Sequence, residues 1–274
     1  MDYLIWNVDP EIFRFGPIAP RWYGLLFASS FLMGYLVMVQ IYRNEKRPAE
    51  NLSSLFTYIF LGTLIGARLG HVIFYQPDYY LWRPWEILMI WQGGLASHGG
   101  FFGVLLAIYF YSRKYAGMGF LELADRSAIP ALLAASFIRI GNFFNSEILG
   151  EPSNVAWAII FAQVDDFPRH PAMLYESFVY ATIFAGLYIA YWKTAIIKSP
   201  GRLLGISFVA SFTARFLIEF VKEAQVPFEQ AMRLNKGQLL SIPFILIGLV
   251  LLYRRRKEGQ HRVRQKNTSP QTPT

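Results

Sequence analysis

The chain has 274 residues, no cysteine and a formal net charge of +8; hydrophobic residues make up 54% of it and charged residues only 16%. Soluble domains carry about 25% charged residues, so this composition indicates a membrane protein. The lack of cysteine excludes disulfides, thiolate metal sites and a cysteine nucleophile of the chain's own.

Seven apolar segments are long enough to cross a bilayer as helices. We expect an all-α membrane protein with spans at residues 21–41, 55–76, 92–112, 121–144, 172–192, 203–221 and 238–253. Residues 1–253 would form one integral-membrane domain, and we expect the basic tail, residues 254–274, to be disordered. The first residues lack a basic segment and a small-residue cleavage site, so we expect no cleaved signal peptide.

Lys and Arg concentrate on one side of this predicted bundle. The connections after the first, third and fifth spans, together with the tail, hold more than half of the 26 Lys and Arg. The positive-inside bias therefore predicts a cytoplasmic C-terminus and a periplasmic N-terminus. The tail is then an anchor at anionic head groups rather than a patch for nucleic acid.

The second span has Gly62, Gly66 and Gly70 at intervals of four residues. This spacing is typical of close helix packing through small residues. Arg68 and His71 lie on one face of the same helix, where they reach an interface or pair with another helix.

The third span begins with His98 between two pairs of glycines. Glycine lets the backbone approach a ligand closely, and histidine titrates near neutral pH, which suits proton transfer. Two interpretations remain open: His98 is a general base, or it is a structural hydrogen-bonding group.

The fourth span ends in the segment Arg139-Ile-Gly-Asn-Phe-Phe-Asn145, which Glu147 follows. A charged side chain at membrane depth costs ~2.5–3.5 kcal/mol, so it usually faces a cavity or a polar partner. Arg139 is either a structural arginine held by Glu147 or Asp125, or it binds a phosphate together with Asn142, for which its planar fork is well suited.

The sixth span repeats this anomaly with Arg215 and Glu219, four residues apart. They form a simple ion pair, or Glu219 holds Arg215 toward an anion, and we favour the second interpretation. Two arginines within the membrane indicate a bound anionic group, for which a lipid phosphate is the first candidate. At the start of the fifth span, Tyr175 and Glu176 give only a weak signal.

Taken in chain order, these segments resemble the prolipoprotein diacylglyceryl transferase family. The matching stretches are Arg21-Trp-Tyr-Gly-Leu25, Gly66-Ala-Arg-Leu-Gly70, Gly93-Gly-Leu-Ala-Ser-His-Gly-Gly100, Arg139-Ile-Gly-Asn-Phe-Phe-Asn145 with Glu147 and Gly150, Arg169-His-Pro171, Leu174-Tyr-Glu176, Arg215-Phe216 with Glu219, and Gly237-Gln-Leu-Leu-Ser-Ile-Pro243. They cover nearly the whole membrane part. Two positions depart from the family's pattern: Ser211 replaces a common tyrosine, and Ala172-Met173 replaces Ser-Gln.

The resemblance implies transfer of a diacylglyceryl group from phosphatidylglycerol to the thiol of the lipobox cysteine in a prolipoprotein, in the bacterial cytoplasmic (inner) membrane. A thioether forms and glycerol phosphate leaves. The implied catalytic residues are His98, Arg139 and Arg215, and the implied substrate-binding residues are Tyr23, Arg139, Asn142, Glu147, Gly150, Arg215 and Glu219. No cofactor and no metal are implied, and we expect a monomer without a nucleic-acid partner.

Other functions fit the sequence less well. A transporter or flippase of an anionic lipid would use the same arginines, but the two halves of the chain show no similarity of the kind that inverted repeats produce. An intramembrane serine protease would need a Gly-x-Ser-Gly elbow, which the chain lacks. A purely structural membrane protein would leave the polar segments unexplained. The transporter is the main alternative.

Overall fold

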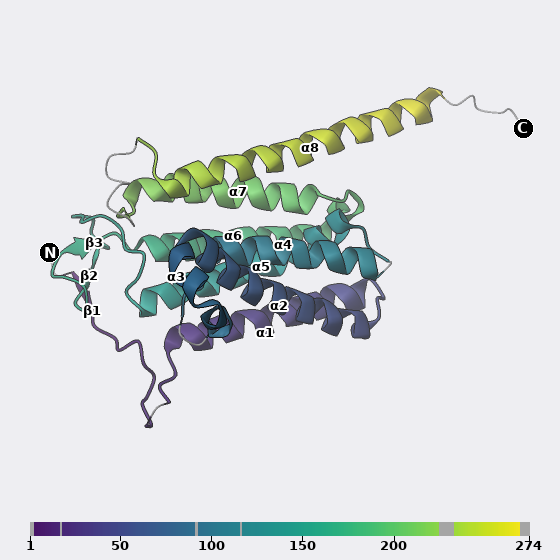
Figure 1. Cartoon of the computed structure of the whole chain (residues 1–274). Coiled ribbons are helices and arrows are strands. Elements are labelled where there is room, and N and C mark those ends of the chain that lie inside the picture. The colour runs from purple at the N-terminus through teal and green to yellow at the C-terminus, as the bar shows by residue number, and fades with distance from the viewer. Residues whose placement is uncertain (1–2, 17, 91–92, 116, 225–232, 269–274) are drawn as a thin grey trace, which may run out of the picture. The chain divides into compact units, whose positions relative to one another are not determined.

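The structure, a computed structural model, describes residues 3–16, 18–90, 93–115, 117–224 and 233–268. Most of this backbone is helical (Figure 1). Six segments have the length and apolar composition of membrane-spanning helices: Trp22–Asn44, Glu50–Phe74, Phe120–Phe144, Ala172–Lys193, Arg202–Val221 and Lys236–Tyr253. They agree with all the predicted spans except the third and confirm that the chain is a helical, multi-pass membrane protein.

The helices follow one another along the chain, and the longest described connection, residues 145–171, lies between α5 and α6. They are α1 (Trp22–Asn44), α2 (Ala49–Phe74), α3 (Pro77–Trp82), α4 (Ser97–Lys114), α5 (Phe120–Phe144), α6 (Ala172–Lys193), α7 (Arg202–Ile218) and α8 (Lys236–Thr268), with 3-10 turns η1 (Pro84–Leu88), η3 (Ile196–Lys198) and η4 (Glu219–Val221). Helix α8 continues to Thr268, through part of the tail for which we expected no regular structure. The last tail residues, 269–274, lie outside the described residues.

Helix α4 corresponds to the third predicted span, but it begins at Ser97 rather than at residue 92. Gly93 and Gly94 have φ values of +86° and +71°, which helical backbone does not allow. Residues 91–92 of the predicted span lie outside the described residues. The 18 residues of α4 include a polar, glycine-rich first turn and Arg113 and Lys114 in the last turn, so its mean hydropathy is lower than that of the six apolar helices.

The chain divides into two compact units, one of residues Met1–Gly34 and Ser127–Thr274 and the other of residues Tyr35–Arg126. In the second unit, α2 packs along α4. A Cβ atom on Gly66 would lie 2.8 Å from the Cα of Gly103, and one on Gly62 would lie 2.6 Å from the Gly103 carbonyl oxygen. Only glycine permits so close an approach, which confirms the packing interpretation of the glycine spacing in α2.

The first unit contains a small sheet that the all-α prediction missed. Strand β1 (Leu4–Trp6) pairs in parallel with β2 (Ile159–Phe161), and β2 pairs antiparallel with β3 (Pro168–Arg169). These strands belong to the extramembrane segments and lie beyond the first turn of α6 (Figure 1). Short β-branched and aromatic runs favour strands where neighbouring segments can bury them. A core of Phe143, Leu149, Ile159, Phe161 and Met173, with Trp6 against it, joins the sheet to the ends of α5 and α6.

Helices α5, α6, α7 and α8 are neighbours within the first unit. The hydroxyls of Ser136 on α5 and Ser177 on α6 lie 2.9 Å apart. Helix α7 contacts α6 and runs alongside α8, where Gly205 and Gly248 allow the two backbones to meet closely (Figure 1). The C-terminal end of α5, the N-terminal end of α6 and the C-terminal end of α7 meet, and Arg139, Glu176 and Arg215 lie there.

We expect the substitution Gly66→Leu to destabilise the protein because its side chain has no room between α2 and α4. Overpacking of this kind costs about 1–3 kcal/mol or more. Gly186→Leu is the matched control, since a Cβ atom at Gly186, in the middle of α6, meets nothing within 4 Å. Thermal unfolding of both purified variants measures the effect, and equal losses in the two variants would contradict the glycine contact.

Candidate active site

A single buried carboxylate gathers three cations at the meeting point of these helices. Glu176, on α6, has no solvent-exposed area, and its Oε2 lies 2.5 Å from the Nε of Arg139 on α5. Its Oε1 lies 3.9 Å from Nη1 of Arg215 on α7 and 3.5 Å from Nζ of Lys222. Neither oxygen of Glu176 has an aligned hydrogen bond within the described residues, so charge attraction dominates these contacts.

A second buried carboxylate, Glu219, closes the cluster from the end of α7. Its Oε1 lies 2.7 Å from Nζ of Lys222 and 3.5 Å from Nη2 of Arg215. Asn235 donates a hydrogen bond of 3.1 Å to its Oε2. Gly237, at the start of α8, has no Cβ atom that would collide with this carboxylate.

We call Arg139, Glu176, Arg215, Glu219 and Lys222 the Glu176 cluster. Its three cations exceed its two carboxylates by one positive charge. Glu176 and Lys222 are buried, while Arg139 and Arg215 keep 14% and 22% of their side-chain surface exposed. A surplus charge in so buried a place is costly unless an opposite charge is close. The cluster is therefore suited to bind an anion, and its two guanidinium groups offer the paired donors that phosphate oxygens accept.

A chain of hydrogen bonds extends from the cluster to the turn after α5. Arg139 donates from Nη1 to Oδ1 of Asn142 at 2.9 Å, and Asn142 donates from Nδ2 to Oε2 of Glu147 at 3.0 Å. The carboxylate in direct contact with Arg139 is thus Glu176, where the sequence suggested Glu147 or Asp125. The correction has a simple reason: Glu176 lies on another helix, which sequence spacing cannot reveal.

The turn that carries Glu147 is strained. Ser146 and Ile148 have φ values of +52° and +59°, a region that a β-branched residue such as Ile148 seldom adopts. The side-chain oxygens of Asn145 and Ser146 are buried and have no hydrogen-bond partner among the described residues. Strain and unpaired polar atoms concentrate at functional sites, where the surrounding structure fixes them.

Gly150 lies where this turn pairs with the segment that holds Lys222. Its N–H donates to the carbonyl of His170 at 2.9 Å, and a Cβ atom would lie 2.7 Å from the carbonyl oxygen of Val221. The N–H of Gly150 is thus already bonded within the protein. Glycine at this position lets the two segments approach and places Lys222 against the cluster.

Arg169 ties the same turn to the extramembrane sheet. It donates to the carbonyl of Gly150 at 3.2 Å and contacts Asp165 at 2.5 Å and Glu223 at 3.3 Å. The hydrogen bond from Arg169 holds the pKa of Asp165 below its usual value. The contribution of this pair to stability is therefore present above the ordinary aspartate pKa and is lost as the pH falls through the lowered value.

Two tyrosines lie next to the cluster. The ring of Tyr23, on α1, packs against Gly141, and its hydroxyl is within electrostatic range of Glu147 and Arg139. Tyr180, one turn after Glu176, is 7% exposed, and its hydroxyl forms a hydrogen bond with Arg215.

The structure brings together most of the residues predicted for the site: Tyr23, Arg139, Asn142, Glu147, Arg215 and Glu219, with Gly150 in the adjoining turn. Sequence patterns do not reveal that Glu176 lies at the centre of the cluster, or that Lys222 and Tyr180 lie beside it. In the sequence, Glu176 stands after Leu174-Tyr175 and gives only a weak signal for a functional site. Lys222 directly follows an apolar run, where a cation that flanks a membrane span is common.

His98 belongs to the other unit, where its exposed side chain lies in the first turn of α4. A Cβ atom on the neighbouring Gly99 would lie 2.8 Å from the Cα of Gly70. Gly99 thus serves helix packing, while Gly93 and Gly94 have positive φ values in the segment before α4. No group of three or more His, Asp or Glu in the described part of the chain could hold a metal ion.

Arg68, in the same unit, supports the backbone that leads into α4. Its guanidinium donates to the carbonyls of Glu86, Ile87 and Gly93 at 2.5, 2.8 and 2.7 Å, and it lies over the ring of Tyr80. These backbone bonds occupy its donors, so its role in the described structure is structural.

Known proteins resemble the chain along most of its length. The family model described as "Prolipoprotein diacylglyceryl transferase" matches residues 10–254. The chain is 50% identical over 258 residues to the phosphatidylglycerol–prolipoprotein diacylglyceryl transferase of Chloroherpeton thalassium, with 94% of this chain and 96% of that protein covered. The protein of that name from Tolumonas auensis is 49% identical over 255 residues, which cover 93% and 98% of the two chains. The one from Bacteroides fragilis is 41% identical over 260 residues, which cover 90% and 94%.

We expect Glu176→Gln to lower the free energy of unfolding because it leaves three cations close together without their shared carboxylate. Breaking a buried ion pair by removing one partner costs about 3–5 kcal/mol. Glu151→Gln is the control, since Glu151 lies near the same turn with an exposed side chain. Unfolding midpoints that fall equally in both variants would contradict the role of Glu176.

Proposed function

The chain belongs to the prolipoprotein diacylglyceryl transferase family, and we propose that its Glu176 cluster is where the family's reaction takes place. The protein transfers the diacylglyceryl group of phosphatidylglycerol to a prolipoprotein. The excess positive charge of the buried cluster is the observation that supports this location, because phosphatidylglycerol carries a phosphate.

The chemistry explains why cations are needed. The cysteine sulfur attacks the carbon of the diacylglycerol unit that is bonded to the phosphate oxygen. A carbon–sulfur bond forms while the bond between that carbon and the phosphate oxygen breaks. Glycerol phosphate leaves with the electron pair of that bond, and negative charge grows on its oxygens. Guanidinium groups fixed against these oxygens stabilise the transition state more than the ground state, which is what accelerates a reaction.

We assign the phosphate contacts to Arg139 and Arg215, with Lys222 as a third cation. Glu176 keeps these cations together when no anion is bound, and Glu219 orients Arg215 and Lys222. The side-chain oxygen of Asn142 accepts a hydrogen bond from Arg139 and holds it in place. The side-chain amide of Asn142 donates a hydrogen bond to Glu147.

We assign the remaining roles in substrate binding from where each residue lies in the structure. Tyr23, half-exposed next to Glu147 and Arg139, is placed to contact the lipid head group. Gly150 acts through the backbone pairing that places Lys222. The thiol proton must also leave, and we propose His98 as the base that accepts it, since histidine suits proton transfer near neutral pH.

We further propose that the chain crosses the bacterial inner membrane seven times, with α4 as the additional span. Helix α4 packs along α2, which has the length and apolar composition of a span. With this count the distribution of Lys and Arg predicts a periplasmic N-terminus and a cytoplasmic C-terminus. We expect the protein to act as a monomer. The relatives are named as transferases, which gives no support to the transporter or flippase alternative.

We expect Arg139→Ala to reduce turnover at least a hundredfold, the usual loss when one charge-stabilising donor is removed. Arg139→Lys should also be poor, because a point charge cannot replace the two-pronged contact of a guanidinium. Purified protein is incubated with phosphatidylglycerol and a lipobox peptide, and the mass increase of the peptide is followed. Arg202→Ala, at the exposed start of α7, is the control. Near-normal turnover by Arg139→Ala would refute the phosphate assignment.

His98→Asn tests the proposed base. Asparagine keeps some hydrogen bonding but cannot accept a proton near neutral pH. If His98 deprotonates the thiol, the defect of the variant should shrink as the pH approaches the thiol's own pKa, near ~8.5. The turnover of the variant, divided by that of the unchanged protein, is measured from pH 6 to pH 9 in the same assay. We expect a defect of roughly a hundredfold or more at neutral pH. A ratio that does not change with pH would assign His98 a structural role.

A further inference from the structure

The two arginines of the Glu176 cluster are held in different ways. Nε of Arg139 lies 2.5 Å from Glu176, and its Nη1 donates to Asn142 at 2.9 Å. The two carboxylates beside Arg215 are farther away, at 3.9 Å for Glu176 and 3.5 Å for Glu219. A hydrogen bond from nitrogen to oxygen measures about 2.7–3.2 Å, so these longer contacts attract by charge without fixing a direction. The direction of the Arg215 guanidinium depends on another group.

Tyr180 is in position to set that direction. It lies on α6 one turn after Glu176, it is 7% exposed, and its hydroxyl forms a hydrogen bond with Arg215. A guanidinium has only donors, so the phenol oxygen of Tyr180 accepts this bond. The turn of α6 between Glu176 and Tyr180 is itself fixed to α5, because the hydroxyls of Ser177 and Ser136 lie 2.9 Å apart.

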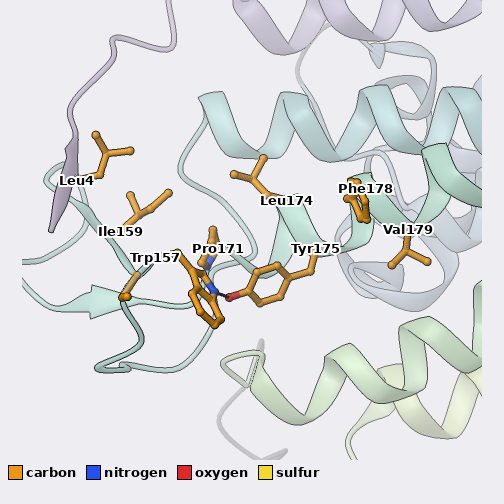
Figure 2. Close-up of a pocket in the computed structure, with 10 residues that line it drawn as sticks. Leu4, Trp157, Ile159, Pro171, Leu174, Tyr175, Phe178 and Val179 are labelled. Atoms are coloured by element: carbon orange, nitrogen blue, oxygen red, sulfur yellow. Dashed lines mark hydrogen bonds between the residues drawn. The ribbon is translucent and has the colours of Figure 1, made fainter.

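Tyr180 shares a face of α6 with Glu176, since the two residues are four apart. The other tyrosine of these turns lies elsewhere: Tyr175 and Phe178 line an apolar cavity on another side of the helix (Figure 2). The hydroxyl of Tyr175 accepts a hydrogen bond of 2.7 Å from the indole N–H of Trp157 there. Of these two tyrosines, Tyr180 is thus the one that serves the cluster.

A neutral partner has an advantage over a charged one at this place. A carboxylate that holds an arginine also offsets its charge, and the cluster already contains Glu176 and Glu219. A phenol oxygen fixes the guanidinium by a hydrogen bond and leaves its positive charge available to an anion. A charged donor that is fixed in advance stabilises a growing negative charge without having to reorganise.

Helix α7 has a hydroxyl of its own near Arg215, but that hydroxyl is bonded elsewhere. Ser211 lies one turn before Arg215, and its Oγ donates to the carbonyl of Ser207 within the same helix. Side chains of a helix lean toward its N-terminus, so the side chain of Arg215 extends over the turn of Ser211. Ser211 also stands where the family's pattern commonly has a tyrosine. In this chain the phenol that reaches Arg215 comes from α6 instead.

We propose that Tyr180 is the positioning residue for Arg215: its phenol oxygen directs the guanidinium toward the phosphate of the lipid. The same guanidinium lies within reach of a tyrosine at position 211, because α7 packs against α6 and Arg215 extends over that turn. This inference rests on the proposed function and deepens it, since it names the contact that prepares Arg215 for the anion.

The variant Tyr180→Phe removes the hydroxyl alone. We expect the kcat of transfer to fall about ten- to hundredfold, as the loss of one hydrogen bond to a charged group does. The KM for phosphatidylglycerol should stay nearly unchanged, because the bond acts on the charge that grows in the transition state. Tyr191→Phe is the matched control, since it removes another buried tyrosine hydroxyl from α6, about 16 Å farther along the helix. An unchanged kcat for Tyr180→Phe, or an equal fall in both variants, would overturn the proposal.

A rescue experiment tests where the hydroxyl is needed. Ser211→Tyr is added to the Tyr180→Phe protein, with Ser211→Phe in the same background as the matched control of nearly equal shape. We expect the tyrosine to raise kcat at least about tenfold above the phenylalanine, because only the tyrosine returns a hydroxyl to Arg215. Equal kcat values for the two double variants would refute the proposal.

A double-mutant cycle separates this inference from the proposed function. If Tyr180 acts through Arg215, Tyr180→Phe lowers kcat in the unchanged protein but has no further effect in Arg215→Ala. Equal factors in both backgrounds would show a role independent of Arg215 and overturn the inference. Near-normal turnover by Arg215→Ala itself would refute the phosphate assignment together with this inference. A large loss in Arg215→Ala without any loss in Tyr180→Phe would refute the inference alone.

Discussion

The membrane site depends on the charge attraction between the buried carboxylate of Glu176 and the cations around it. Arginine and lysine side chains at membrane depth repel one another and lose their hydration, so they require a partner that the bilayer does not supply. Glu176 supplies it for Arg139, Arg215 and Lys222 at once. Because Glu219 balances one further charge, the cluster keeps a surplus of one positive charge. The arrangement that holds the helices together is therefore also the arrangement that attracts an anion.

The rest of the first unit holds the charged side chains of the Glu176 cluster close together. Helices α5, α6 and α7 each contribute one member of the cluster, Glu219 is the first residue of η4, and Lys222 follows η4. The strained turn around Glu147 and the backbone pairing at Gly150 join the ends of α5 and α7, and Arg169 ties this turn to the sheet. A guanidinium stabilises a growing charge only if it is already in place. In the reaction that we propose for this site, these contacts keep Arg139 and Arg215 in position.

The first turns of α6 present two different surfaces. Glu176 and Tyr180 face the arginines, whereas Leu174 and Phe178 line an apolar cavity. One helix thus separates a charged environment from an apolar one, and its own backbone hydrogen bonds leave no unpaired backbone group on either side.

The sequence determined the helical membrane class, the approximate ends of six spans, the glycine contact of α2 and the presence of two arginines within apolar spans. These follow from local signals: apolar length, small-residue spacing and the cost of a charge in hydrocarbon. The structure alone decided that Glu176 is the shared partner of Arg139 and Arg215, that Lys222 belongs to the cluster, and that Leu4 forms a strand with Ile159. Each of these pairs joins residues far apart in the chain. Sequence spacing reports which residues share a face of one helix, whereas contacts between elements depend on how those elements pack, and only the tertiary structure fixes that.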